Sequence, residues 1–322
     1  MTSSRRIRVA AAQLGPIQPS ETREMVVARL MDMMREAHAC GCTLIVYPEL
    51  ALTTFFPRYA LPDDAVEPYF ERSMPGPATQ PLFDLSASLG VGFYLGFAEL
   101  AEAGDGPQKG FNSSVLVNRS GKVVGLYRKV HLPGYVEPRP NYPNQHLEKR
   151  YFHVGDLGFP SWRTMGGVFG MALCNDRRWP ETYRVMALRG AEMILIGYNT
   201  AAKNNYADEP QHLRMLHHKL AVQSGAYQNA TWVVTAAKAG TEDGTKLIGG
   251  SCIIAPTGEI VAQAATEGEE LVVGGCDLDL AAYMKRSVFD FARHRRVEHY
   301  GLIVERTAAI APEADADAEA AV

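Results

Sequence analysis

The stretch Val168-Phe-Gly-Met-Ala-Leu-Cys174-Asn-Asp-Arg-Arg-Trp-Pro-Glu181 is an apolar run that ends abruptly in a thiol and a polar turn. A short apolar run bounded by turn residues is typical of a buried strand. We therefore expect a strand over 168–173 that delivers Cys174 to a turn rich in arginine. Nearby cations and a helix N-terminus both lower the pKa of a thiol from its usual value of about 8.5, which favours a reactive thiolate. A structural thiol beside a surface turn is the alternative.

Two other segments have the same design, in which an apolar strand ends in a charged residue. In Leu44-Ile-Val-Tyr-Pro-Glu49, the carboxylate follows a short buried strand and a proline that has no backbone donor. In Val123-Val-Gly-Leu-Tyr-Arg-Lys129, the two adjacent cations point to opposite faces of an extended chain, so one of them can face a site. Each segment alone is also compatible with a solvated loop glutamate or with solvated cations at a strand end.

A glutamate, a lysine and a cysteine at strand ends together supply what amide hydrolysis needs. A thiol needs a base to take its proton, the leaving nitrogen needs an acid, and the tetrahedral oxyanion needs positive charge or hydrogen-bond donors. Other hydrolytic designs are disfavoured, because no G-x-S-x-G elbow follows a strand and no histidine pair has metal-ligand spacing. His217 and His218 are neighbours on an expected helix, so we interpret them as structural and expect no metal and no other cofactor.

Strand and helix patterns alternate along the chain, and two hairpins interrupt them. Apolar periodicity predicts a helix that Ser20 caps and that ends near Ala39, and it predicts three later helices over 78–89, 181–189 and 211–227. Turn residues predict hairpins over 113–127 and 251–264, whose similar sequences suggest an internal duplication of a β-α-β-hairpin unit. The hairpins exclude a purely parallel sheet and favour mixed sheets with helices packed outside.

The composition is that of a globular protein with a sizeable apolar core. The 322 residues are 47% hydrophobic and 21% charged, with a formal net charge of −4 and five irregularly spaced cysteines, which we expect to be reduced. Because no basic patch and no long apolar run is present, we expect a cytoplasmic protein with neither nucleic-acid nor membrane partners. We also expect a single domain over 1–306 and a disordered, acidic, alanine-rich tail over 307–322.

The three strand-end segments carry a resemblance to a known family. Pro48-Glu49, Tyr127-Arg-Lys129-Val-His-Leu132 and Cys174-Asn-Asp resemble the three motifs of the nitrilase, or carbon–nitrogen hydrolase, superfamily, over roughly 6–305. Longer segments resemble one branch of that superfamily, the N-carbamoyl-D-amino-acid amidohydrolases or D-carbamoylases. These segments are 48–57, His146-Leu-Glu-Lys-Arg-Tyr-Phe152, 155–160, 174–181 and His299-Tyr-Gly-Leu302.

The resemblance implies a fold and a catalytic set. The implied fold is of the α/β class, a four-layer αββα sandwich with mixed, nitrilase-like sheets, and two such units are expected to pair in a homo-oligomer, either a dimer or a tetramer. The resemblance implies Cys174 as the nucleophile, Glu49 as the general base and Lys129 as the stabiliser of the oxyanion. It also implies Glu148 as a second carboxylate near the lysine and the substrate.

Further residues are implied to surround the substrate. Arg177 and Arg178 resemble a clamp for a carboxylate, which a planar guanidinium binds in a bidentate manner. An ion pair of one of them with Asp176 or Glu181 is the alternative. The remaining implied residues are two asparagines expected to contact the substrate and two histidines expected to support the site, namely Asn175, Asn199, His131 and His146.

The expected reaction is hydrolysis of N-carbamoyl-D-amino acids to the D-amino acid, carbon dioxide and ammonia through a carbamoyl-enzyme on Cys174. The alternatives are another amidase of the superfamily, acting on N-carbamoyl-β-alanine, N-carbamoylputrescine or an aliphatic amide, and an inactive scaffold that keeps the fold. A cationic substrate fits poorly beside two arginines, and a plain amide does not need a carboxylate clamp. Loops 135–145 and 200–210 depart from the D-carbamoylase pattern and are expected to border the pocket, so the side-chain preference stays open.

Overall fold

The computed structural model describes residues 5–100, 110–142, 145–203 and 209–311, and its centre consists of two six-stranded mixed sheets. In the first sheet, three neighbouring strands run parallel and the flanking strands are antiparallel to their neighbours. In spatial order its strands are β14 (Glu270–Asp277), β1 (Arg6–Gln13), β2 (Leu44–Val46), β3 (Gly92–Leu100), β4 (Gly110–Val117) and β5 (Val123–Arg128).

The second sheet repeats the topology of the first. Its central strands β7, β8 and β9 are parallel, and the chain then continues into an antiparallel hairpin, as it does after β3 in the first sheet. In spatial order its strands are β13 (Ile260–Gln263), β12 (Cys252–Ile254), β9 (Trp232–Ala237), β8 (Met193–Tyr198), β7 (Gly167–Leu173) and β6 (Ser161–Thr164). This repetition agrees with the duplication that the two hairpin sequences suggest.

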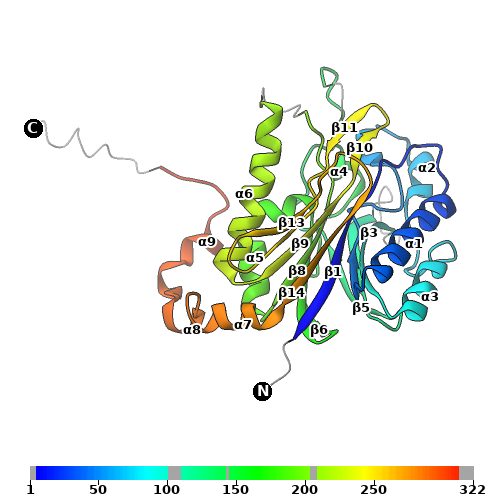
Figure 1. Ribbon diagram of the computed structural model, residues 1–322. Coiled ribbons are helices and arrows are strands. Elements are labelled where there is room, and N and C mark those ends of the chain that lie inside the picture. Colours follow the sequence, from blue (N-terminus) through cyan, green and yellow to red (C-terminus); the bar gives the residue numbers. More distant parts are fainter. Residues whose placement is uncertain (1–4, 101–109, 143–144, 204–208, 312–322) are drawn as a thin grey trace, which may run out of the picture.

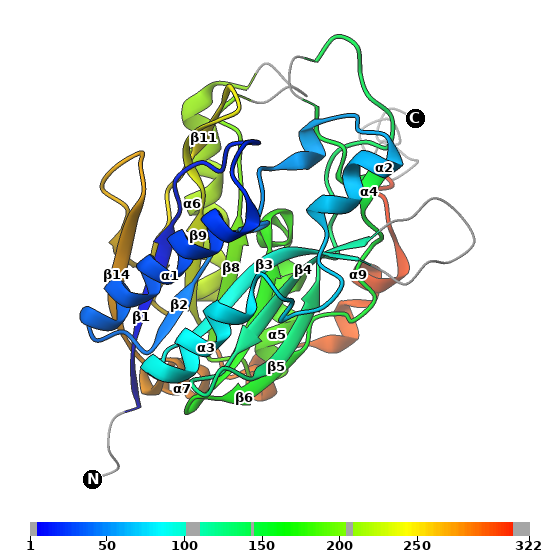
Figure 2. The same ribbon diagram turned by 90° about the vertical axis from the view of Figure 1, so that its right-hand side faces the viewer.

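The two sheets pack face to face, and helices cover their outer faces (Figure 1). One apolar cluster fills the space between the sheets and contains Leu44, Tyr94, Met171 and Leu195. On the first sheet lie α1 (Arg23–Ala39) and α3 (Gln80–Leu89), and on the second lie α5 (Pro180–Leu188) and α6 (Gln211–Asn229). Figure 2 looks onto the layers face-on, with α1 and α3 towards the viewer. The expected four-layer αββα sandwich is confirmed.

Helix α1 shows why these segments fold as they do. The apolar side chains that recur at helical spacing, Val26, Leu30, Met33, Met34 and Ala37, are all buried. The predicted cap was wrong by two positions, because Thr22 rather than Ser20 accepts a hydrogen bond from a backbone N–H of the first turn, at 3.3 Å. Ser20 lies in the preceding turn.

Two features of the sheets are missing from the sequence prediction. Strand β14 pairs along its whole length with β1, so the two ends of the folded region are neighbours, and Cys276 lies inside this strand. A separate two-stranded hairpin consists of β10 (Ala239–Glu242) and β11 (Thr245–Ile248). The remaining elements are short and comprise η1 (Phe56–Arg58), α2 (Asp63–Val66), η2 (Glu67–Tyr69), α4 (Glu148–Tyr151), η3 (Cys174–Arg178), α7 (Leu278–Arg286), α8 (Phe291–His294), η4 (Val297–His299) and α9 (Gly301–Glu305).

Of the predicted tail, 312–322 lies outside the described residues, while 307–311 is exposed and belongs to neither helix nor strand. The disordered tail and the single domain over 1–306 stay predictions. Within the described ranges, no helix combines the length and the apolar character that a membrane span requires.

Candidate active site

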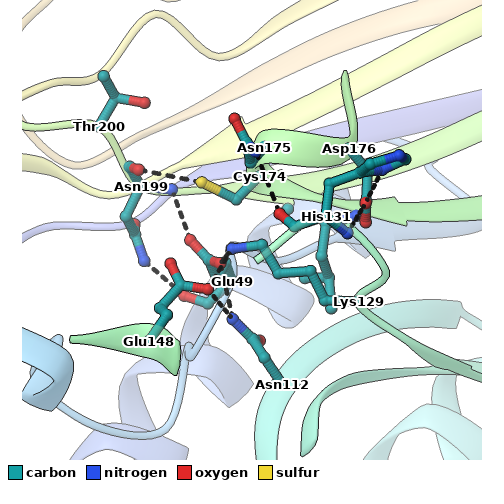
Figure 3. A network of polar contacts seen from close by, with 12 residues as sticks. Glu49, Asn112, Lys129, His131, Glu148, Cys174, Asn175, Asp176, Asn199 and Thr200 are labelled. Carbon is teal, nitrogen blue, oxygen red and sulfur yellow. Dashed lines mark hydrogen bonds and ion pairs between the residues drawn. The ribbon is translucent and has the colours of Figure 1, made fainter. Parts of the chain in front are cut away.

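The ends of three strands place Glu49, Lys129 and Cys174 in one buried region (Figure 3). Glu49 follows β2 and Lys129 follows β5 in the first sheet, while Cys174 follows β7 in the second. Their exposed fractions are 0%, 1% and 6%, so all three side chains are withdrawn from bulk solvent. The structure thus brings together the three strand ends that the sequence analysis singled out, while their catalytic roles stay predictions.

Two glycines make room for the turn that carries Glu49. A Cβ atom on Gly96 in β3 would lie 2.6 Å from the carbonyl oxygen of Pro48, and one on Gly197 in β8 would lie 2.6 Å from the backbone nitrogen of Glu49. Both approaches are closer than packed atoms allow, so a larger residue would displace the turn. The Pro48–Glu49 turn therefore sits between the two sheets because both neighbouring strands carry glycine there.

Lys129 lies between two buried carboxylates. Its Nζ donates to Oε1 of Glu49 at 2.7 Å and to Oε2 of Glu148, on α4, at 2.6 Å. Burial alone would lower the pKa of Lys129, but Cys174 in its ionised form and the carboxylates of Glu148 and Glu49 outweigh it and raise that pKa well above its usual value. Burial would likewise raise the pKa of Glu148, but Lys129 and His146 lower it to about 2. The lysine is therefore a fixed cation and Glu148 a fixed anion.

Asn112 on β4 joins the same network, and the sequence analysis missed it. Its Nδ2 donates to Glu49 Oε1 at 2.9 Å and to Glu148 Oε2 at 3.4 Å, and the side chain is fully buried. In the sequence, Asn112 is a single amide directly before the strand that we expected to begin at residue 113. Asn112 holds the two carboxylates in place from the side of the first sheet.

Cys174 stands at a sharp turn between β7 and η3. Its φ of 44° lies in the left-handed region, which costs a non-glycine residue free energy and is common at functional positions. Its Sγ donates to the carbonyl oxygen of Asn199 at 3.3 Å. The backbone N–H of Asn199 donates to Glu49 Oε2 at 3.1 Å, so one residue at the end of β8 contacts both the thiol and the carboxylate.

The expectation of a lowered thiol pKa is wrong. Burial is the largest influence on Cys174 and, with the charge of Glu49, it raises the pKa of the thiol to about 11. Lys129 and Arg177 act in the opposite direction but do not compensate. Because the thiol is protonated at neutral pH, it needs a base at the moment of reaction, and Glu49 is the carboxylate that shares a backbone anchor with it.

Arg177 is buried, and its guanidinium donates hydrogen bonds to other groups of the protein. Its Nη1 donates to the carbonyl oxygen of Cys174 at 2.6 Å, its Nη2 to Thr200 Oγ1 at 2.9 Å and its Nε to His218 Nδ1 at 3.2 Å. The guanidinium also stacks 4.3 Å from the centre of the Tyr198 ring. Burial lowers the pKa of His218 well below its usual value, so this histidine is a neutral, hydrogen-bonded residue, as predicted.

The second arginine of the predicted clamp has a different environment. As a residue Arg178 is exposed and lines the pocket, although desolvation of its side chain lowers its pKa to about 10. In the described part of the chain it makes no hydrogen bond or ion pair. Neither arginine pairs with Asp176 or Glu181, so the alternative of a structural ion pair with those residues is wrong. Of the two guanidinium groups, that of Arg178 is the more available to a ligand.

His131 supports the turn that carries the thiol. Asp176, fully buried, accepts hydrogen bonds from His131 N at 2.8 Å, Tyr127 Oη at 2.6 Å and Leu173 N at 3.1 Å, and its Oδ1 also lies 2.8 Å from His131 Nδ1. Asn175 donates from Nδ2 to the carbonyl oxygen of His131 at 3.1 Å. The supporting role predicted for His131 agrees with these contacts, while a direct contact between Asn175 and substrate stays a prediction.

His146 and Asn199 also hold the catalytic carboxylates. His146 Nε2 lies 2.9 Å from Glu148 Oε1. Asn199 Nδ2 donates to the carbonyl oxygen of Glu49 at 2.8 Å, and its Oδ1 accepts from Lys238 N at 3.2 Å. Because both ends of its amide are occupied within the chain, we interpret Asn199 as a positioning residue, although it lines the pocket.

A pocket of about 300 Å³ opens above Cys174. Apart from His146, every charged side chain among the described lining residues is a cation, namely Arg58, Arg177, Arg178, Lys203 and Arg214. Gln145, Thr200, Ala201 and Lys203 belong to the two divergent loops, so both loops border the pocket as expected, although 143–144 and 204–208 lie outside the described residues. Within the described ranges, no group of three or more histidine, cysteine, aspartate or glutamate side chains is arranged to hold a metal.

Comparison with known proteins agrees with this geometry. A family model described as carbon-nitrogen hydrolase matches residues 8–286. The chain belongs to this family. It is 32% identical over 289 residues to an N-carbamoylputrescine amidase of Arabidopsis thaliana, which covers 86% of this chain and 89% of the relative. It is 29% identical over 297 residues to a nitrilase of Pyrococcus abyssi, which covers 91% of this chain and 99% of the relative.

A solved structure shows the same fold. A carbon-nitrogen hydrolase from Helicobacter pylori G27 superposes with a TM-score of 0.81 at 23% identity, over 94% of this chain and 99% of that chain. The superfamily resemblance is thus confirmed, and the protein is an amidohydrolase of this superfamily. The narrower resemblance to D-carbamoylases is not matched by these relatives, because the first of them is an N-carbamoylputrescine amidase.

Proposed function

We propose that the protein hydrolyses the carbamoyl group of small N-carbamoyl amino acids, with N-carbamoyl-D-amino acids as the leading substrates. The observation that carries this proposal is the set of Cys174, Glu49 and Lys129 beneath a pocket in which, among the described lining residues and apart from His146, every charged side chain is a cation. A pocket with such a lining favours a substrate that carries a carboxylate. The preference for the D configuration rests on the sequence resemblance and not on the pocket geometry.

The proposed reaction begins with proton transfer from the Cys174 thiol to Glu49. The thiolate attacks the ureido carbonyl carbon, and Lys129 with a backbone N–H stabilises the negative oxygen of the tetrahedral intermediate. The intermediate expels the amino nitrogen, which takes the proton from Glu49, and a carbamoyl thioester remains on Cys174. Water, activated by Glu49, then cleaves the thioester and releases carbamic acid, which decomposes to carbon dioxide and ammonia.

Arg178 is the proposed partner of the substrate carboxylate. Arg178 lines the pocket, whereas Arg177 already donates to three groups of the protein. Arg177 contributes positive charge from a fixed position next to Cys174, since its Nη1 lies 3.8 Å from Sγ. Asn175 and Lys203 also line the pocket and are further candidates for contact with the substrate.

A second candidate activity is hydrolysis of N-carbamoylputrescine. The sequence relative from Arabidopsis thaliana favours it, because it is named for that substrate and aligns over most of both chains. The cationic amine of N-carbamoylputrescine would have to bind beside Arg178 and Lys203, and the repulsion between these charges opposes this binding. Hydrolysis of N-carbamoyl-β-alanine and hydrolysis of an aliphatic amide are the remaining alternatives.

Ammonia release from a panel of substrates decides between these activities. The panel comprises N-carbamoyl-D- and L-amino acids, N-carbamoyl-β-alanine, N-carbamoylputrescine and simple amides. We expect the highest kcat/KM for the D-amino acid derivatives. The variant Arg178→Met is expected to raise their KM by about tenfold, the effect of losing a charge-assisted hydrogen bond, with no such change for neutral amides. Arg189→Met, at the exposed end of α5, is the matched control. A higher kcat/KM for N-carbamoylputrescine would overturn the proposal.

A further inference from the structure

A second buried ionic cluster lies next to the pocket, and none of its members takes part in the bond-breaking steps described above. It consists of Glu242 at the end of β10, Lys238 just before β10 and Arg58 in η1. The exposed fractions are 0% for Glu242 and Lys238 and 9% for Arg58. Placing one carboxylate and two cations out of solvent costs free energy, which the contacts within the cluster have to offset.

Glu242 uses both carboxylate oxygens and its backbone carbonyl. Oε1 accepts hydrogen bonds from Phe55 N at 2.7 Å and Arg58 Nη2 at 2.8 Å. Oε2 accepts from Lys238 Nζ at 2.8 Å and Ile17 N at 3.0 Å. The carbonyl oxygen of Glu242 accepts from Arg58 Nη1. Three separate segments of the chain thus meet at Glu242, namely the one around Ile17, the loop that holds Phe55 and Arg58, and the stretch 238–242.

Two of those segments form the pocket wall. Phe55 and Arg58 line the pocket from the loop after Glu49, and Thr245 and Leu247 line it from β11. Glu242 pairs with Thr245 across the β10–β11 hairpin. The position of the loop relative to the hairpin therefore depends on the bonds of Glu242 to Phe55 and Arg58.

The same cluster reaches the catalytic residues through Lys238. Its Nζ donates to the carbonyl oxygen of Thr53 at 2.6 Å as well as to Glu242. Its backbone N–H donates to Oδ1 of Asn199, the residue whose backbone contacts both Cys174 and Glu49. Lys238 is absent from the pocket lining, so its effect on a substrate would be transmitted through its neighbours.

We propose that Glu242 is a positioning residue for substrate binding, which fixes the wall formed by Phe55, Arg58 and the β10–β11 hairpin relative to the Cys174 site. This role rests on the proposed function in one respect, namely that the substrate occupies the pocket above Cys174. It does not depend on which amide or ureido compound the enzyme hydrolyses.

Kinetics of Glu242→Gln test the proposal, since this substitution keeps the shape and removes the charge. We expect KM to rise at least about tenfold for the panel compound that the unaltered enzyme hydrolyses best, with a much smaller change in kcat. The alkylation rate of Cys174 by iodoacetamide, a small neutral probe, should stay within about twofold of the unaltered enzyme. A fall in kcat at constant KM in a folded variant would overturn the proposal.

The matched control is Glu192→Gln. Glu192 is also a largely buried carboxylate, 12% exposed, and pairs with Arg5 at 2.8 Å, but it is absent from the pocket lining. This variant should lose stability without a change in KM. If it raised KM as much as Glu242→Gln, the effect would be general destabilisation and the proposal would fail.

Two further measurements keep the test decisive if Glu242→Gln does not fold or if no panel compound is hydrolysed. Lys238→Met leaves Glu242 and Arg58 as a balanced pair and should raise KM by a few-fold. Hydrogen exchange of the intact enzyme reports positioning without any substrate, and in either variant the amides of 53–58 and 239–248 should exchange faster than in the Glu192→Gln control. Unchanged exchange in both segments would overturn the proposal, whereas failure of the substrate panel alone would overturn only the proposed function.

Discussion

At the scale of single residues, the site separates fixed charges from a proton that moves. Lys129 is held as a cation between Glu49 and Glu148, and Glu148 is held as an anion by Lys129 and His146. The Cys174 thiol, with its pKa raised to about 11 by burial and by Glu49, is the group that has to lose a proton before it can attack. This arrangement supports the proposed roles of Glu49 in proton transfer and of Lys129 in electrostatic stabilisation.

Replacement of Glu49 by glutamine separates its two effects on the thiol. The loss of a general base should lower kcat by about 10²–10⁴-fold. The loss of its negative charge should at the same time lower the thiol pKa below about 11, because Glu49 is one of the groups that raise it. The pH profile of Cys174 alkylation by iodoacetamide measures this shift, with Glu192→Gln as control. A profile centred at about 8.5 in the unaltered enzyme would contradict the raised pKa.

At the scale of elements, the short helix η3 is tied to the first sheet through Asp176. This buried carboxylate accepts from Tyr127 on β5, from the backbone of His131 and from the backbone of Leu173. The bond to Tyr127 crosses from one sheet to the other, so the turn that carries Cys174 and the strand end that carries Lys129 are fixed to each other. The geometry of the nucleophile therefore depends on a contact between the sheets.

Substitution of the two partners measures this contact. Asp176→Asn should destabilise the fold by about 2–3 kcal/mol, because it removes a charge that three buried donors require, and Tyr127→Phe by about 1 kcal/mol. Since the two residues share one hydrogen bond, the double variant should lose less than the sum of the single variants. Urea unfolding of the four proteins measures this coupling, and strictly additive losses would show that the bond contributes nothing.

Sequence patterns predicted the elements and the strand ends but not the contacts across the molecule. The apolar runs before Glu49, Lys129 and Cys174 identified their positions because a buried strand has a local signature. Asn112, Asp176 and Glu242 were not identified as functional, because their partners lie far away in the sequence and only the packing of the two sheets brings them together. Strand β14 was missed for a related reason, since its partner is the first strand of the chain.

At the scale of the whole molecule, the duplicated sheets place their strand ends around one site that neither half could form alone. The first half supplies Glu49 and Lys129, and the second supplies Cys174 and Asn199. The homo-oligomer that the resemblance implies, dimer or tetramer, stays a proposal. Exposed apolar side chains on the outer helix α6, namely Leu216, Leu220 and Tyr227, are compatible with it, and light scattering of the purified protein measures the assembly directly.

The buried charges also determine how the fold responds to acid. The folded pKa of Glu148 is lowered to about 2 from its usual 4.5, so its contribution to stability is complete above pH 4.5 and is lost as the pH falls towards 2. The free energy of unfolding should fall over this range by an amount on the order of 3 kcal/mol from this residue alone. In Glu148→Gln that part of the pH dependence should vanish, as urea unfolding at several pH values would reveal. An unchanged acid dependence in this variant would contradict the assignment of Glu148 as a fixed anion.

The central claim is that Cys174 forms a covalent carbamoyl intermediate. Mass spectrometry of the intact protein, quenched with acid during turnover of an N-carbamoyl-D-amino acid, tests it most directly. We predict a mass increase of one carbamoyl group, located on Cys174 by peptide mapping and absent from Cys174→Ala, which should also be inactive. An unmodified Cys174 during turnover, together with full activity of Cys174→Ala, would contradict the mechanism.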